Sequence, residues 1–193
     1  MTSETQKNMD AASARFDEAE QACRRSREAL LGAVAAAVPD NAEALAEQAV
    51  SPQIDRLREI GRERIDAMRD QLRVEARVLA DRVRASVDVV KWPATNLHST
   101  KPEYIREAIL PLFDYDTLQS LAEPIRMAGL MTATMPVSGR TFVSLGSLTA
   151  ALSEVADKTS DLNAAKAALD DAIAANNASD LKELWPTRNT QQP

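Results

Sequence analysis

The 193-residue sequence is poor in the residues that tight turns, large aromatic cores and crosslinks require. It has five glycines, and aromatic side chains make up 4% of its residues. A single cysteine excludes an intramolecular disulfide, and a single histidine excludes the paired histidines of common zinc sites. Alanine is abundant instead, which favours closely packed helices over sheets. The composition therefore predicts an all-α protein.

The sequence also lacks a long apolar run and an excess of positive charge. Its most apolar run, Ala29 to Val38, is well short of the roughly 20 residues that cross a bilayer. Residues 1–7 are polar, with no apolar segment of signal-peptide length behind them. The net charge of −6 gives no broad positive field for nucleic acid or anionic membranes. We therefore expect a cytoplasmic protein without a stable membrane span.

The strongest pattern is a hendecad repeat in the centre of the chain. Eleven residues complete three helical turns, so a 4-4-3 spacing keeps an apolar stripe on one face of a straight helix. Ser51–Pro52 supplies an N-cap and a first-turn proline, which predicts a helix from about residue 51 to 90. The stripe comprises Leu57, Gly61, Ile65, Met68, Leu72, Ala76, Leu79, Val83, Val87 and Val90.

Heptad stripes predict two further long helices. The first spans about residues 3–38, ends before Pro39 and is followed by a short helix over about 40–50. Its stripe is mostly small residues, with the lone cysteine as a buried member: Met9, Ala12, Phe16, Ala19, Cys23, Ser26, Leu30, Ala33 and Ala37. The second spans about 147–176, with Lys166 breaking its stripe and Asn176–Asn177 as its C-cap. Because each stripe needs a partner, we expect an elongated antiparallel three-helix bundle that resembles a coiled coil.

Residues 91–145 hold most of the aromatic side chains and are expected to form a small inserted head with its own core. Two short helices are predicted, one opened by residues 100–103 and one by Asp116 with Gln119, with Pro124 bending the second. Alternating residues 131–143 around Ser138–Gly139 predict a β-hairpin. The expected organisation is stalk helices at 1–90, the head at 91–145, a third stalk helix at 146–178, and a short helix with a disordered tail at 179–193.

No group of residues points to catalysis, a metal or a cofactor. His98 lies in a polar loop without a second histidine, and the sequence has none of the glycine-rich phosphate-binding or nucleophile motifs. We therefore expect no enzyme activity.

A row of arginines follows the hendecad stripe one residue behind: Arg62, Arg69, Arg73, Arg77 and Arg84. Acidic residues stand three positions before most of these arginines, so we expect i,i+3 ion pairs that neutralise much of the row. Exposed pairs of this kind contribute little stability, and their expected use is solubility and register against a neighbouring helix or subunit. An acidic partner surface is the alternative.

The second candidate binding surface lies in the predicted head. It is an adaptable, methionine-rich apolar surface for a protein partner, with one arginine beside it: Met127, Leu130, Met131, Met135 and Arg140. The alternative is that these methionines fill the core of the head.

These features favour a non-catalytic interaction or assembly module, in which the stalk presents the head to a protein partner or self-associates. Stripes of small residues bury modest area, so we expect a homo-oligomer. The order helix, helix, hairpin resembles a winged-helix module, which makes a nucleic-acid-binding regulator with a dimerising stalk the first alternative. A membrane-active protein with an inserting hairpin is the second.

Overall fold

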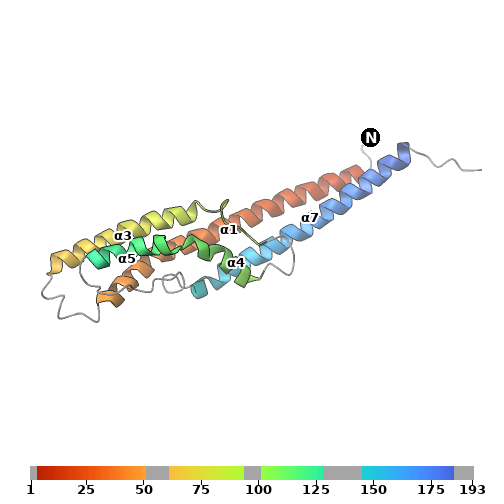
Figure 1. The fold of residues 1–193 in the computed structure, drawn as a ribbon. Helices are drawn as coiled ribbons and strands as arrows, with labels where there is room; N and C mark the ends of the chain where they lie inside the picture. The colour runs from red at the N-terminus through yellow and green to blue at the C-terminus, as the bar shows by residue number, and fades with distance from the viewer. Residues whose placement is uncertain (1–3, 51–60, 94–100, 128–144, 185–193) are drawn as a thin grey trace, which may run out of the picture.

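The protein is an elongated set of helices built around one long helix (Figure 1). The computed structural model describes residues 4–50, 61–93, 101–127 and 145–184. Helix α1 spans Glu4–Val50 and α7 spans Thr149–Leu184; α1, at 47 residues, is about 70 Å long. Between them lie α3 (Arg62–Arg84), α4 (Pro102–Ile109), η3 (Leu110–Leu112), α5 (Tyr115–Met127) and η4 (Leu145–Leu148).

Helix α1 packs against α7 along its N-terminal part and against α3 along its C-terminal part. Both neighbours run antiparallel to α1. Cys23 of α1 is buried and contacts Thr159 of α7, and Arg24 bonds to Asp88, just after the end of α3. The predicted α1 stripe is half-buried up to Ala19 and buried at Cys23, Ser26 and Leu30. A second buried line then begins, along the part of α1 that α3 covers: Leu31, Ala35, Val38 and Ala42.

The hendecad prediction is confirmed from Ile65 onward. Ile65 and Val87 are half-buried, and the other members are buried: Met68, Leu72, Ala76, Leu79, Val83 and Val90. Helix α3 ends at Arg84, however, and not near residue 90. The N–H groups of Val89 and Val90 both donate to the Ser86 carbonyl in a tight turn, because three β-branched valines within four residues disfavour further helix. Residues 51–60 of the predicted helix lie outside the described residues.

The prediction that α1 ends at Val38 is wrong, because the helix continues through Pro39 to Val50. A proline inside a helix removes one backbone hydrogen bond and crowds the preceding turn. The second buried line runs past this position, with Val38 before the proline and Ala42 after it. Asn41 also donates its side-chain amide to the Ala37 carbonyl at 2.6 Å. Tertiary packing therefore keeps α1 continuous, and the separate helix predicted over 40–50 is its last part.

The predicted C-cap at Asn176–Asn177 is also wrong, since α7 runs on to Leu184. Asn176 is buried and donates its amide to the Asp180 carboxylate one turn later, at 3.2 Å. A bond to a side chain in the next turn stabilises a continuing helix, whereas a C-cap needs a left-handed residue. No non-glycine residue with positive φ occurs in the described chain.

The all-α class is confirmed, but the β-hairpin head must be corrected: the described residues form helices and contain no strand. Residues 131–143 of the expected hairpin lie outside the described residues. Helices α4 and α5 pack beside α7 and α3. The buried residues of these two helices and of the segment between them join the same apolar cluster as those of the long helices: Ile105, Ile109, Phe113, Leu118 and Leu121. The boundaries predicted at 91 and 145 remain predictions.

Helix α5 is joined to α3 by a small polar network. The Asp114 carboxylate accepts a hydrogen bond from the Thr117 backbone N–H at 2.6 Å and so caps the first turn of α5. Arg82 of α3 donates to the Thr117 hydroxyl at 3.1 Å. Hydrogen bonding to Thr117, aided by the charge of Arg82, holds the pKa of Asp114 below its ordinary value. The capping acid is therefore Asp114, two residues before the predicted Asp116.

We expect Pro39→Ala to raise the free energy of unfolding by about 1–3 kcal/mol, because the new N–H can bond to the Ala35 carbonyl. Urea unfolding followed by far-ultraviolet circular dichroism measures the change. Asp40→Ala, an exposed neighbour in the same turn, is the control and should shift stability by less than about 0.7 kcal/mol. A Pro39→Ala protein no more stable than the native one would contradict this account.

Asp114→Ala should lower the free energy of unfolding at pH 7 by about 0.5–2 kcal/mol, because the cap is lost. The folded pKa of Asp114 lies below its ordinary 3.8, so the cap stabilises fully above that pH and fades as pH falls through the folded pKa. The stability difference between the two proteins should therefore close in acid. Asp116→Ala, which leaves the cap intact, should lose less. A difference that persisted at the lowest pH permitting folding would argue against the cap.

Candidate functional site at the junction of the bundle and a two-helix arm

Beyond the end of α3, α1 and α7 continue side by side without a third described helix (Figure 1). We call residues 4–22 of α1 and 160–181 of α7 the two-helix arm. A pair of helices shields its seam incompletely, and the seam residues of the arm are mostly half-buried: Met9, Ala12, Phe16 and Ala19 on α1, and Leu162, Ala165, Leu169 and Ala172 on α7. The outer faces of both helices are therefore open.

The seam of α7 changes register inside the arm. Lys166, the predicted break, is exposed, and Ala165 takes its place in the seam. Every second position of the heptad stripe moves one residue earlier in this way. Ala172 is half-buried where heptad spacing would give Ile173, and Ile173 is 38% exposed. The predicted break at Lys166 is confirmed, and Ile173, which the heptad spacing of that stripe would place inside it, lies outside the seam.

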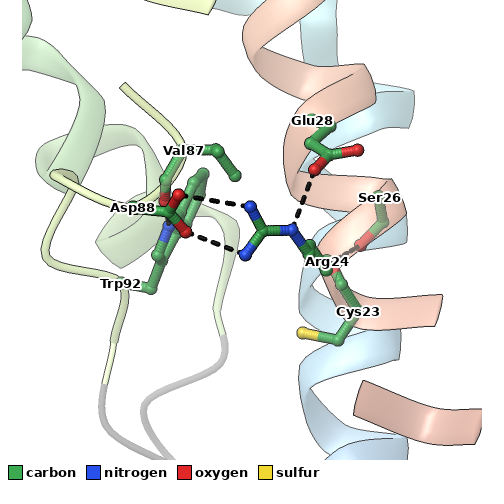
Figure 2. A network of polar contacts seen from close by, with 7 residues as sticks. All are labelled: Cys23, Arg24, Ser26, Glu28, Val87, Asp88 and Trp92. Atoms are coloured by element: carbon green, nitrogen blue, oxygen red, sulfur yellow. Dashed lines mark hydrogen bonds and ion pairs between the residues drawn. The ribbon is translucent and has the colours of Figure 1, made fainter. Parts of the chain in front are cut away.

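The junction between bundle and arm lies where the turn after α3 meets α1. Figure 2 shows Arg24 of α1 reaching across to Asp88. Its two terminal nitrogens donate to the two carboxylate oxygens at 2.8 and 3.2 Å, and its Nε donates to Glu28 at 3.0 Å. The hydrogen bonds and charge of Asp88, reinforced by Glu28, raise the pKa of the Arg24 guanidinium. Because these groups are largely exposed, the bidentate pair fixes position more than it adds stability.

Trp92 holds the same turn from the other side. Its indole Nε1 donates to the Val87 carbonyl at 2.9 Å, and the Arg27 guanidinium lies over the ring, 5.1 Å from its centroid. The Nε atom of Arg27 is buried and has no hydrogen-bond partner among the described residues, so the ring face is its main compensation. Trp92 therefore packs against the core that the long helices share.

A hollow of about 340 Å³ opens at this junction. Its lining combines two arginines, two carboxylates and the single cysteine: Glu20, Gln21, Cys23, Arg24, Arg27, Val87, Asp88 and Leu162. The opposite charges balance, so the hollow exerts no strong net field on an ion. The cysteine sulfur lies 3.7 Å from the Thr159 hydroxyl and is buried. Among the described residues no group of three or more His, Cys, Asp or Glu side chains is placed to hold a metal ion.

The predicted arginine row is exposed along α3: Arg62, Arg69, Arg73, Arg77 and Arg84. Three predicted ion pairs are confirmed, from Arg69 to Asp66 at 3.9 Å, from Arg73 to Asp70 at 3.2 Å and from Arg84 to Asp81 at 2.8 Å. Glu59, the expected partner of Arg62, lies outside the described residues. The row is thus partly neutralised within its own helix, and its binding role remains a prediction.

The predicted methionine surface is described only at its first residue. Met127 ends α5 and is 66% exposed. The other members of that surface, and His98, lie outside the described residues: Leu130, Met131, Met135 and Arg140. Within the described ranges no helix has an apolar stretch that could cross a membrane.

Sequence reasoning missed the residues of the junction. Asp88 was expected inside a longer helix, and Trp92 in the core of a separate head. Arg24 and Arg27 lie beside the α1 stripe. Two arginines next to the buried Cys23 were the one feature of the sequence that could have indicated this junction. The bond from Arg24 to Asp88 joins residues 64 positions apart, which no local pattern can reveal.

Comparisons with known protein families, curated proteins and solved structures find no match. The contacts, exposure and charge of the junction and the two-helix arm therefore carry the functional argument alone.

Trp92→Ala should lower the free energy of unfolding by about 1–3 kcal/mol, because indole burial and the Arg27 contact are both lost. Chemical unfolding followed by circular dichroism measures the loss. Trp92→Phe keeps a ring beneath Arg27 but loses the bond to the Val87 carbonyl, and should fall between the two proteins. Equal stability of all three proteins would mean that Trp92 does not anchor the turn.

Proposed function

We propose that this protein is a non-catalytic assembly module that binds another protein through its two-helix arm. The observation that carries the proposal is the change at the junction from multi-helix packing to a pair of helices without a third helix among the described residues. The bidentate Arg24–Asp88 contact and the anchored Trp92 hold that change at a fixed place. A rigid pair of helices with open outer faces is suited to receive a further helix.

The outer faces of the arm support this function. On α7, Ile173 and Leu181 are 38% and 66% exposed, and two helical turns separate them on neighbouring parts of one face. Large apolar side chains gathered on one exposed face are typical of interaction surfaces. Met127, at the end of α5, is also exposed and apolar and is a candidate for a further contact.

The nucleic-acid alternative has less support. At least three arginines of α3 are paired with aspartates of the same helix, and acidic residues outnumber basic ones in the two-helix arm. Phosphate binding needs unneutralised positive charge. We place the assembly in the cytoplasm, a compartment that suits the single free cysteine.

The test is photo-crosslinking in cells of the source organism, with benzoylphenylalanine in place of Ile173 or Leu181. Both side chains project from the arm, so we expect each to form a covalent adduct with a protein, whether another chain or a second copy. The matched control carries the crosslinker at Glu107, an exposed position on α4. If the arm positions formed no more adduct than Glu107, the arm would not be a binding surface.

A further inference from the structure

Helix α3 carries a second apolar stripe, which is exposed. Val74 and Val78 are 57% and 52% exposed, on the side opposite the buried stripe at 100° per residue. Exposed Ala67 and Ala85 extend the same line with helical spacing. The predicted arginine row borders this line on one side. Helix α3 therefore carries an exposed apolar line opposite the face that packs against α1 and α5.

The exposed charges of α3 and of the two-helix arm have opposite balance. Helix α3 contains seven arginines against five acidic residues. The arm contains nine acidic against three basic residues. All of these side chains are exposed except Glu75, which is half-buried. Most of the acidic excess of the chain thus lies on the arm, and α3 offers the complementary surface.

The arm and α3 also match in length and packing. At 1.5 Å per residue, α3 is about 35 Å long and residues 4–22 span about 29 Å. Leu31, Ala35 and Val38 are buried and follow Arg24, which bonds to the end of α3, by 7, 11 and 14 residues, so helical spacing places them on the face of α1 turned toward α3. Five turns earlier, about 18 residues at 3.6 per turn, the same face of α1 carries Ser13, Asp17 and Glu20. The surface of α1 on which a third helix would pack therefore continues into the arm, where it is polar and includes two acidic residues.

We propose that the partner of the arm is a second copy of this chain, in a closed antiparallel dimer. The inference rests on the proposed function and names its partner. A two-fold axis near the junction places the arm of each copy against the exposed stripe of α3 in the other. The exposed line of Val74 and Val78 then lies against the arm, and the positive charge that remains on α3 after its internal ion pairs, seven arginines against five acidic residues, attracts the carboxylates of the arm. Both contacts form at once, so the assembly closes at two copies.

The size of this interface fits a specific dimer. A helix face about 30 Å long and 10 Å wide covers about 300 Å² in projection. Each copy contributes two such faces, its arm and its α3, and the total for two copies is about 1,200 Å². That area is at the lower end for stable protein interfaces, so we expect a dimer in reversible equilibrium with the monomer.

Sedimentation velocity of the purified chain from 1 to 100 μM tests the dimer. We expect a monomer–dimer equilibrium whose dissociation constant rises at least tenfold between 50 and 500 mM NaCl, because salt screens the exposed charges. The doubly substituted chain Val74→Asp, Val78→Asp should sediment as a monomer with unchanged helicity. Tyr104→Asp, at a half-exposed apolar residue on α4, should dimerise normally. A monomer at every concentration, or open-ended oligomers, would overturn the proposal.

A crosslinker in place of Val74 tests the geometry, with isotope-labelled and unlabelled chains mixed so that adducts between copies can be identified. Adducts between copies should map to residues 4–22 or 160–181, and mapping elsewhere would refute this arrangement. The two proposals can fail separately. A monomeric chain whose arm captures a different protein in cells refutes the dimer alone, whereas an arm that captures nothing refutes both.

Discussion

The structure depends on α1 remaining one helix through Pro39. If α1 ended at that proline, the buried line beneath α3 would lose Ala42, and α3 would pack on a shorter helix. Packing compensates for the lost backbone bond, because Val34, Ala35, Val38 and Ala42 are all buried around the proline. Helix α1 packs against α7 with one face and against α3 with another. Helix α4 then packs on α7, and α5 packs on α3.

A change of polarity along one face of α1 sets where the bundle ends. The face that is Leu31, Ala35 and Val38 beneath α3 is Ser13, Asp17 and Glu20 in the arm. Arg24 stands at the boundary and binds Asp88 in the turn that ends α3. Apolar burial therefore holds α3 on one side of that boundary, and polar contacts close its end. In the arm, the contact described for α1 is its half-buried seam with α7.

Patterns that recur within one helix could be predicted from the sequence. The α3 stripe, the i,i+3 pairs and the burial of Cys23 each depend on helical period alone. Errors arose where packing decides the outcome, and where a side chain has a choice between capping a helix and bonding within it. Packing carries α1 past Pro39, and Asn176 bonds forward to Asp180 instead of capping α7. The junction had no local signal, because Arg27 and Trp92 meet only after α1 and α3 have packed.

The sorting of charge between α3 and the arm is not required by the fold of one copy. Exposed pairs within a helix contribute little stability, and any mixture of signs would keep these surfaces soluble. A separation into an arginine-rich helix and an acidic arm instead affects orientation and specificity of association, which depend on complementary fields. Val74 and Val78 lie at the centre of the arginine-rich helix and are left exposed by the described chain. The charge of α3 therefore favours an acidic neighbour, and its exposed valines mark the face on which that neighbour would pack.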